Sequence, residues 1–397
     1  MISILLAAAL AASPDLDLPD VHVGRPRVRP TEVYLAPLAG GPAARDAQDA
    51  LSLALRASGL FDVVSPDAPA LRWRITGSVA SGAPASATIR ILDAAGRETR
   101  ALTIRGAPRA IGHALADALI AELRAGPGPF SARLAAVRAE GRSHRIVVAD
   151  WDGRNERTAY VEDGPLALHG WRPDGGALLF TTWRRGRPEV WLLELATGSA
   201  RPLLAVGELT TAATFSPRGD RIAFVAVERG NADVYVAAAD GSGIRRLTTD
   251  AGVDTSPTWS PDGARIAFLS EREGRPHVFV MNADGTNSRR AAWSLAEEQA
   301  PRFAPRGDAL AFAGRDADGW GLYTVSVGGA GSAATPAPLR VAGASRVPEA
   351  SWDPSALLLA FADPAAGVVV ATADGARITV LPATGGLASV AWGPGRR

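Results

Sequence analysis

The chain has 397 residues, of which 47% are hydrophobic and 21% are charged, and its formal net charge is +1. This length predicts two or three domains, and the balanced charge argues against nucleic acid or an anionic membrane as a standing partner, because both attract concentrated basic surfaces. The sequence contains no cysteine, which excludes a disulfide framework, thiolate zinc ligands and a cysteine nucleophile.

An apolar run opens the chain and predicts export. Residues 2–12 are hydrophobic apart from Ser3, and residues 9–11 (Ala-Leu-Ala) match the small-x-small pattern that precedes a signal peptidase cut. Acidic residues follow directly, so the run is too short to span a membrane. We therefore expect a signal peptide at residues 1–12, an extended segment at residues 13–30, and a periplasmic protein that is not membrane-spanning. No cation precedes the run, which leaves a mis-assigned start or a buried N-terminal strand as alternatives.

Residues 31–126 mix helical and strand patterns and are expected to form a small α/β domain. Alternating runs predict five strands, at residues 33–37, 60–64, 71–79, 86–92 and 98–104. Two helices are predicted from apolar residues at i, i+3, i+4 spacing, with the faces Ala47, Ala50, Leu51, Ala54, Leu55 and Ile111, Ala114, Leu115, Ala118, Leu119. A Gly-Pro-Gly-Pro cluster at residues 126–129 predicts an interdomain hinge.

From residue 130 onward a long repeat replaces the helical period. The motif aromatic-x-Pro-x-Gly begins at residues 171, 215, 259 and 303, which are 44 residues apart, and shorter forms begin at residues 352 and 392. Proline fixes φ and the closing glycine relieves crowding, so each motif predicts a tight turn between two strands. A self-similar unit of this length with four short strands is a propeller blade.

The two ends of the repeat region complement each other. Residues 130–161 contain three strand-like runs but lack an opening aromatic turn, whereas residues 388–392 form an opening strand with nothing after it. We expect the C-terminal strand to complete the first blade, because this pairing removes an exposed sheet edge. Residues 130–397 are thus predicted to form a six-bladed β-propeller, and the fold class is mainly β with a small α/β domain in front.

The unit aromatic-Ser-Pro-Asp-Gly-x-x-Ile-Ala-Phe at residues 259–268 resembles the WD40-like repeat of the TolB family. A signal peptide, an α/β domain and a six-bladed propeller in this order are similar to that family over nearly the whole chain. The resemblance implies a scaffold, not an enzyme, in a Tol-Pal-like envelope system that supports outer-membrane integrity, cell division and protein import. It implies no cofactor, a propeller mouth that binds the peptidoglycan-associated lipoprotein Pal, and a protein that is monomeric when alone.

In the TolB family, loops that precede the first strand of each blade form the surface that faces Pal. Here the corresponding residues are 209–213, 253–256 and 297–299, and the candidates for partner binding are Leu209, Thr210, Thr211, Ala212, Asp254, Thr255, Ser256, Glu298 and Gln299. Thr255 is the position that the resemblance carries over most readily. The family's N-terminal segment engages TolA, but residues 16–30 match that segment poorly and the α/β domain is shorter than usual, so the resemblance supports Pal more than TolA.

Enzymatic chemistry finds little support in the sequence. It contains no Gly-x-Ser-x-Gly nucleophile elbow, and no two of its five histidines have a metal-ligand spacing: His22, His113, His144, His169 and His277. The Asp-Gly pairs are typical hairpin turns, and the aromatic series is expected to pack between neighbouring sheets. Two alternatives stay open. One is a sensor that binds a glycan or peptide in a deep apolar pocket; the other is a hydrolase or lyase whose channel collects His, Asp or Glu from several blades.

Overall fold

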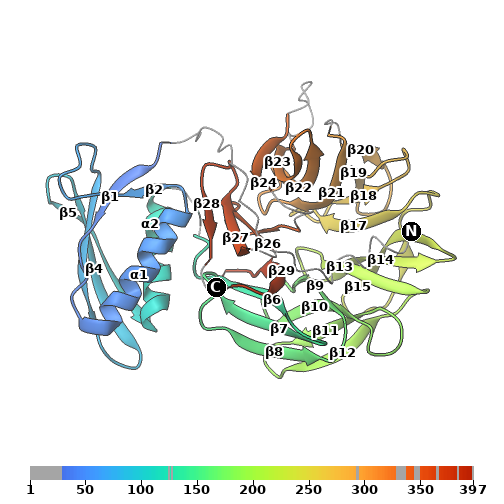
Figure 1. Cartoon of the computed structure of the whole chain (residues 1–397), viewed down its shortest axis with the longest axis horizontal. Coiled ribbons are helices and arrows are strands. Elements are labelled where there is room, and N and C mark those ends of the chain that lie inside the picture. The colour runs from blue at the N-terminus through green and yellow to red at the C-terminus, as the bar shows by residue number, and fades with distance from the viewer. Residues whose placement is uncertain are drawn as a thin grey trace.

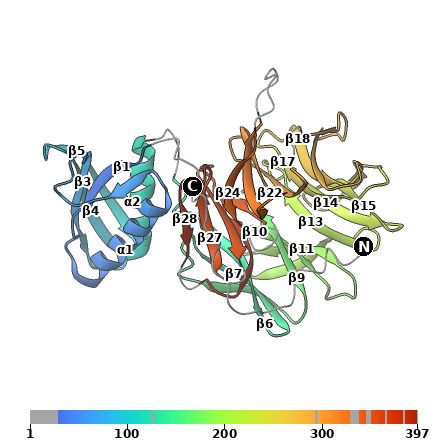
Figure 2. The ribbon, with the colours of Figure 1, turned by 45° about the horizontal axis from the view of Figure 1, so that its top comes forward.

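The computed structural model describes residues 29–123, 126, 128–291, 295–327, 337–343, 349–363, 366–381 and 384–395. The predicted signal peptide and nearly all of the extended segment lie outside the described residues. Figure 1 shows two parts side by side, an α/β unit and a ring of small sheets, and Figure 2 shows the same arrangement from another direction.

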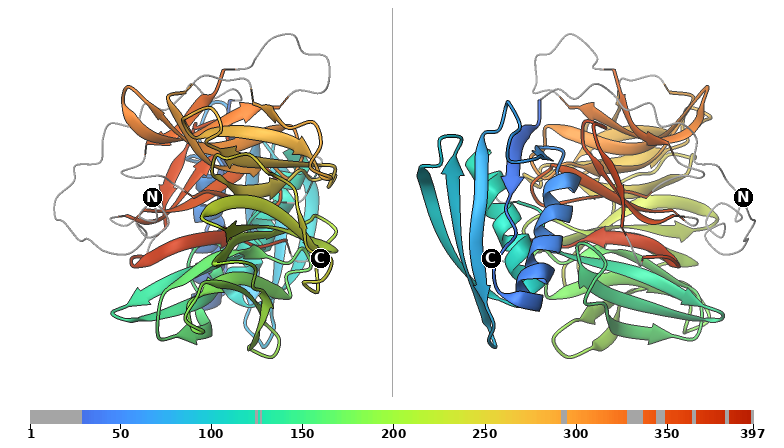
Figure 3. Two further views of the ribbon diagram at one scale, coloured as in Figure 1. Left: turned by 90° about the vertical axis from the view of Figure 1, so that its right-hand side faces the viewer. Right: turned by 60° about the vertical axis from the view of Figure 1, so that its left-hand side comes forward.

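The α/β unit is one sheet covered by two helices. The sheet has the order β2-β1-β3-β4-β5, and β1 is parallel to both of its neighbours. Its elements are β1 (Thr31–Leu35), α1 (Gly41–Ala57), β2 (Phe61–Val63), β3 (Trp73–Ala80), β4 (Ala85–Asp93), β5 (Glu98–Gly106) and α2 (Pro108–Leu123). Both helices lie on the side of the sheet that faces the propeller (Figures 1 and 3). The five predicted strands and two predicted helices are confirmed.

The helices differ in how well their buried faces were predicted. All five apolar residues predicted on one face of α1 are buried. On α2, Ala114 and Ala118 are only half-buried, whereas Ala116 and Ile120 are fully buried, so the predicted face was too narrow. The reason is that α2 packs on α1 and also contributes to a hydrophobic cluster shared with the propeller, which requires a wider apolar stripe.

The two helices approach each other closely at Gly112. A Cβ atom at this position would lie 2.2 Å from the carbonyl oxygen of Ala47 and 2.9 Å from the Cβ of Ala50. Alanine normally stabilises a helix interior by about 1 kcal/mol over glycine, but separating two packed helices costs about 1–3 kcal/mol. A 2.2 Å approach to a backbone oxygen places the cost at the upper end of this range, so we expect Gly112→Ala to destabilise the α/β unit by up to about 2 kcal/mol, a reversal of the usual sign.

Urea denaturation followed by circular dichroism at the helix band measures this change, because α1 and α2 supply the helical signal of the described residues. Gly164→Ala is the matched control, since a Cβ there meets no atom within 4 Å. A Gly112→Ala protein as stable as wild type or more stable contradicts the close packing.

The ring consists of six four-stranded sheets. Given from the first strand to the fourth, the first three blades are β29 (Leu387–Trp392), β6 (Arg133–Glu140), β7 (Ser143–Asp150), β8 (Arg157–Glu162); β9 (Leu166–Trp171), β10 (Ala177–Thr182), β11 (Glu189–Glu194), β12 (Ser199–Leu204); and β13 (Leu209–Phe215), β14 (Arg221–Glu228), β15 (Asn231–Ala238), β16 (Arg245–Arg246). The last three are β17 (Asp254–Trp259), β18 (Arg265–Ser270), β19 (His277–Asn282), β20 (Arg289–Arg290); β21 (Glu297–Phe303), β22 (Ala309–Asp316), β23 (Gly319–Ser326), β24 (Leu339–Gly343); and β25 (Ser351–Trp352), β26 (Leu358–Asp363), β27 (Gly367–Thr372), β28 (Ile378–Val380).

The C-terminal strand closes the ring, as the sequence predicted. β29 pairs antiparallel with β6, with Val390 opposite Ala136 and Trp392 opposite Leu134. The first blade is thus built from both ends of the propeller segment, and β6 is covered on the side that would otherwise be an open edge. This confirms the six-bladed architecture.

The motif aromatics pack between neighbouring blades, as expected. The buried members of the series are Phe215, Trp259, Phe303, Trp352 and Trp392. Three indole N–H groups donate to a carbonyl oxygen of the first strand in the preceding blade: Trp171 to Ala391 (2.9 Å), Trp259 to Thr214 (3.3 Å) and Trp352 to Arg302 (3.0 Å). These bonds link the first strands of successive blades around the channel.

The α/β unit and the propeller share one hydrophobic cluster. It joins Ile111 and Leu119 of α2 to Phe130 and Trp151 of the first blade. Asp117 of α2 accepts hydrogen bonds from the backbone N–H groups that follow the connection, at residues 130 and 131, each at 2.8 Å. The C-terminal side of the predicted hinge is therefore attached to α2, and motion at residues 126–129 stays a prediction.

Candidate partner-binding face

The propeller has two faces that differ in which strand ends they carry. The first strand of every blade begins on one face, which we call the opening face, and ends on the other, the turn face, at its motif aromatic. An aromatic-x-Pro-x-Gly turn follows in four of the blades. The start of β17 at Asp254 pairs with the end of β18 at Ser270, so the end of the second strand also lies on the opening face. The predicted mouth corresponds to the opening face.

The prediction that the mouth residues form loops is wrong. The structure places them in the first strands of three successive blades: Leu209, Thr210, Thr211 and Ala212 in β13, Asp254, Thr255 and Ser256 in β17, and Glu298 and Gln299 in β21. Of the three ranges, only residue 253 precedes its strand. Polar residues suggested a loop, but a backbone beside the channel must pair its N–H and C=O groups, and the second strand of each blade supplies the partners.

One position in each of these strands is a buried polar anchor. Thr210, Asp254 and Glu298 are 44 residues apart and have no exposed surface. The hydroxyl of Thr210 accepts a hydrogen bond from the backbone N–H of Val206 at 2.7 Å and lies 2.9 Å from the Val206 carbonyl oxygen. Buried polar groups need such partners, so these three side chains hold the strand starts in place and have no exposed surface.

Asp254 is held by an arginine. Its Oδ2 accepts a hydrogen bond from Nη2 of Arg272 at 3.0 Å, and the same guanidinium pairs with Asp250 at 2.9 Å. The guanidinium carbon of Arg272 lies 4.7 Å from the ring centroid of Phe279, a cation–π distance. Burial raises the pKa of Asp254, while hydrogen bonding to Ser270 and the charge of Arg272 act in the opposite direction.

Glu298 is held by the neighbouring blade. Its Oε2 accepts a hydrogen bond from the backbone N–H of Val278 at 2.9 Å, and its Oε1 lies 3.7 Å from Nδ1 of His277. Burial lowers the pKa of His277, and the charge of Arg290 lowers it further. The anchor thus joins β21 to the third strand of the blade before it.

A β-bulge follows each anchor. The register shifts between Thr211 and Thr214, between Thr255 and Thr258, and between Gln299 and Arg302. The residue that begins each bulge has a positive φ although it is not glycine: Ala212 (50°), Ser256 (53°) and Ala300 (47°). Left-handed φ at such residues is uncommon and stores strain. Because the bulge recurs at the same position in three blades, it is a regular feature of the blade structure.

Five of the nine candidates remain accessible. They are the partly exposed Leu209, Ala212, Thr255, Ser256 and Gln299. They follow or flank the buried anchors. The backbones of Leu209, Thr255 and Gln299 are paired to the second strands, whereas Ala212 and Ser256 lie in the bulges. The opening face therefore presents side chains from a rigid frame.

A second set of buried polar residues lies on this face and was not predicted from the sequence. Glu189, Asp233 and His277 lie at or near the starts of third strands, are 44 residues apart and are buried. Arg187 pairs with Glu189 at 3.0 Å, and Arg246 pairs with Asp233 at 2.5 Å. Their spacing equals the blade period, so aligning the repeats at this position could have revealed them.

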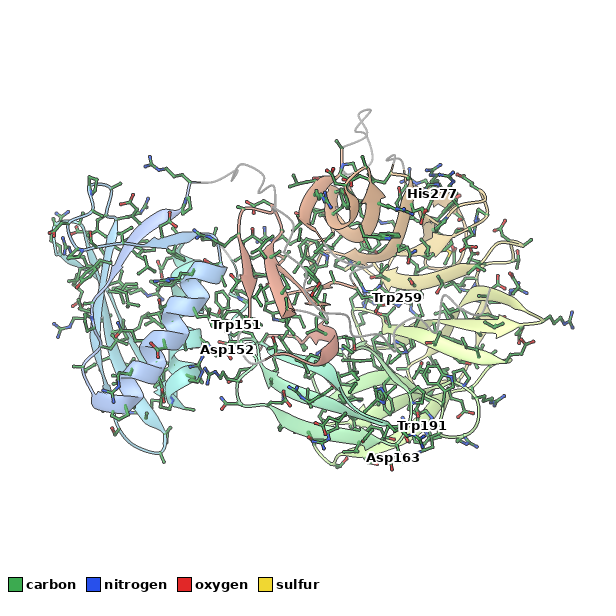
Figure 4. All side chains as sticks on the ribbon, viewed as in Figure 1. Trp151, Asp152, Asp163, Trp191, Trp259 and His277 are labelled. Atoms are coloured by element: carbon green, nitrogen blue, oxygen red, sulfur yellow. The ribbon has the colours of Figure 1, made fainter. Side chains whose placement is uncertain are left out.

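The α/β unit leaves the opening face uncovered. Within the described residues, its polar contacts with the propeller involve residues 130 and 131, which precede β6, and Asp152 and Arg377, which follow the ends of β7 and β27 on the turn face. Figure 4 shows Trp151 and Asp152 at the boundary between the two parts and His277 on the side of the propeller away from the α/β unit. A partner can therefore approach the opening face without displacing the α/β unit.

Among the described residues, no group of three His, Asp or Glu side chains is placed to hold a metal ion. None of the helices in that part of the chain is both long enough and apolar enough to cross a membrane.

The strands and helices define a class of protein, a six-bladed β-propeller that follows a five-stranded α/β unit. Residues 121–396 match the family model described as the TolB beta propeller domain. This chain belongs to the TolB family.

Relatives support this assignment over part of their length. The Tol-Pal system protein TolB of Anaeromyxobacter sp. (strain K) is 37% identical over 232 residues, which cover 50% of this chain and 54% of the relative. The Tol-Pal system protein TolB of Aromatoleum aromaticum is 30% identical over 222 residues, which cover 49% of this chain and 52% of the relative. The chain thus spans about half the length of the curated relatives it matches.

A solved structure is similar over nearly the whole fold. The crystal structure of TolB from Acinetobacter baumannii has a TM-score of 0.82 at 20% identity and covers 94% of this chain and 99% of that one. At this identity the likeness shows the fold alone.

Proposed function

We propose that this protein is a periplasmic scaffold of a Tol-Pal-like system and binds a Pal-like lipoprotein on its opening face without bond chemistry. The observation that carries the proposal is the uncovered opening face, where partly exposed side chains of three blades stand on buried anchors. Such a frame loses little conformational freedom on binding, which favours protein recognition. The names of the relatives, Tol-Pal system protein TolB, support a partner from that system.

The proposal also covers domain limits, export, oligomeric state and cellular role. We propose domain limits at residues 31–126 and 130–397, export through a signal peptide at residues 1–12, and a monomeric state in the absence of a partner. A role in outer-membrane integrity and cell division follows from membership of a Tol-Pal-like system. Engagement of a TolA-like protein by residues 13–30 is the part with the least support, because that segment matches the family poorly.

Thr255→Arg tests the proposed interface. Thr255 is partly exposed and lies between the Asp254 anchor and the bulge at Ser256. A long cation at this point would be placed against a partner that docks on the opening face, and we expect affinity to fall by at least about 100-fold. Isothermal titration calorimetry with the soluble domain of the Pal-like lipoprotein from the same organism measures the change.

Thr103→Arg is the matched control, because Thr103 is exposed on β5 at the far edge of the α/β sheet. Both variants should keep the melting temperature of the wild-type protein within a few degrees, since surface changes are usually small. If Thr255→Arg binds as tightly as wild type, the interface lies elsewhere, and if wild type does not bind, the proposed partner is wrong.

A further inference from the structure

A cavity lies inside the propeller at the turn-face end of the channel. Its volume is about 330 Å³, and first strands and turns of several blades line it, including Arg302 of β21, His169 of β9 and the turn residues Pro173, Pro305 and Pro394. The turn residues place the cavity at the opposite end of the channel from the proposed partner interface. We propose that this cavity binds a small organic carboxylate, with the Arg302 guanidinium as the group that binds the carboxylate.

Arg302 is the exception at its position in the blade. The residue immediately before the motif aromatic is small in the other five blades: Gly170, Thr214, Thr258, Ser351 and Ala391. Small side chains at this point leave room along the channel, whereas Arg302 brings one cation into it. A structural requirement of the blade does not explain an arginine in one blade of six.

The guanidinium has unused hydrogen-bonding capacity. Nη1 donates to the carbonyl oxygen of the adjacent Pro301 at 2.9 Å, which is the one hydrogen bond that its side chain makes with the described residues. No carboxylate of those residues lies within 4.0 Å of it. Each guanidinium nitrogen of Arg302 that lacks a hydrogen-bond partner is accessible to solvent. Its remaining N–H donors are therefore available to a ligand in the cavity. Arginine carries five N–H donors in a fork that matches a carboxylate.

No carboxylate of the described residues forms an ion pair with this cation, although Glu349 lines the same cavity. Burial lowers the pKa of Arg302, and the carboxylate of Glu349, which is exposed, opposes that shift. An exposed charge is screened by water. Removing an uncompensated guanidinium from bulk water is unfavourable, and an incoming anion that pairs with it recovers part of that cost.

His169 faces Arg302 from the opposite side of the ring and stays neutral. β9 and β21 begin blades that are three apart in a ring of six. Nε2 of His169 lies 2.7 Å from Oγ1 of Thr181, which fixes the ring. Burial lowers the pKa of His169 to about 3, with a further contribution from the charge of Arg302. A neutral imidazole adds a polar wall without a competing negative charge.

The rest of the wall selects for an apolar body attached to the carboxylate. Aromatic rings surround the cavity, namely Trp171, Phe215, Phe303, Trp352 and Trp392. Two other charged residues line the cavity: Arg172, which pairs with Asp174 at 2.9 Å and Glu194 at 2.8 Å, and Glu349, which is exposed. Mostly aromatic and apolar walls with few polar groups are typical of sites for small organic ligands, and the volume lies at the small end of the usual range. An inorganic anion would use Arg302 but leave the rings uncovered.

Phenylacetate and phenylacetamide are suitable probes, because they have nearly the same shape and differ in charge. Titration of each into the full chain by isothermal titration calorimetry at neutral pH should show phenylacetate binding at least about tenfold more tightly. Arg302→Gln should reduce phenylacetate affinity about tenfold and leave phenylacetamide unchanged. Arg306→Gln is the matched control, since Arg306 is exposed in the turn that follows β21.

The source of the carboxylate is distinguished by a second pair of probes, the dipeptide Ala-Phe and its C-terminal amide. Tighter binding of the dipeptide than of phenylacetate assigns the cavity to a chain terminus, and the reverse assigns it to a free small acid. The proposal is overturned if acid and amide bind equally or if neither binds at millimolar concentration. Equal phenylacetate binding by Arg302→Gln also overturns it. The acid–amide comparison needs only the wild-type protein, so it decides the matter even if the variant does not fold, and neither outcome depends on the Pal-like partner.

Discussion

Deleting residues 387–397 is expected to abolish the cooperative unfolding transition of the propeller at room temperature or to lower its melting temperature by more than about 10 °C. The deletion removes β29, the strand that completes the first blade. It also removes the buried Trp392, whose loss alone costs about 3–5 kcal/mol. A domain is held folded by only about 5–15 kcal/mol. The shortened protein would also expose β6 as an unpaired edge, which favours aggregation.

Thermal unfolding followed by circular dichroism at the strand band measures the loss. A synthetic peptide of residues 384–397 added in trans should restore part of the transition by pairing with β6, whereas a scrambled peptide of the same composition should not. If the peptide restores the transition, the loss of stability results from the missing strand and not from a general effect of shortening the chain. A deleted protein that melts like wild type would show that ring closure contributes little to stability.

This closure was predictable from the sequence because it requires only that the repeats and their opening strands be counted. Five repeats carry their own opening strand, one lacks it, and one strand at the C-terminus has no blade of its own. Turn chemistry and period identify such units without knowledge of any long-range contact. The face of α1 was predictable for the same reason, since its burial follows the helical period within 17 consecutive residues.

The mouth was harder to predict because its polar residues have two different roles. Asp254 and Thr255 are neighbours in sequence, yet the first is a buried anchor and the second is partly exposed. The difference depends on Arg272, 18 residues away, which pairs with Asp254. A polar residue that starts a channel-lining strand looks like a loop residue when its partners are unknown.

The contact between the α/β unit and the propeller was not predicted at all. Residues 150–153 read as an Asp-Gly hairpin turn, and that turn does form, with the N–H of Gly153 bonded to the carbonyl oxygen of Asp150. The two residues in the middle of the turn are nevertheless buried, because α2 covers them. Trp151 stands where the equivalent turns of other blades have alanine, but the covering helix lies about 40 residues earlier in the chain, so the sequence near the turn does not reveal what buries it.

Asp152→Ala is expected to destabilise the contact between the two parts by about 3 kcal/mol at pH 6. Asp152 is fully buried; Arg109 pairs with its Oδ2, and Nε2 of His113 lies 3.3 Å from the same oxygen. Removing one partner of a buried ion pair leaves the others without compensation, which costs about 3–5 kcal/mol when burial is complete. The side chain of Arg109 keeps 20% of its surface exposed, so the lower end applies.

The effect should depend on pH in a defined direction. Burial by itself raises the pKa of Asp152, but hydrogen bonds and charges of His113 and Arg109 outweigh it and lower the pKa to about 2, below the usual 3.8. The folded state therefore binds a proton less readily than the unfolded state. The stabilisation, about 2 kcal/mol, is fully present above about pH 5 and is lost as the pH falls toward 2. The stability difference between wild type and Asp152→Ala should shrink over the same range.

Urea denaturation at several pH values between 6 and 2.5 measures this difference, and hydrogen exchange of α2 reports whether the helix has separated from the propeller. Asp163→Ala is the control, because Asp163 is exposed on the propeller (Figure 4) and its loss should have the same small effect at every pH. A constant difference between Asp152→Ala and wild type across the pH range would mean that the carboxylate is not the ionised partner of Arg109. Equal stability at pH 6 would mean that Asp152 contributes nothing measurable, and that the shared hydrophobic cluster and the other polar contacts hold the two parts together.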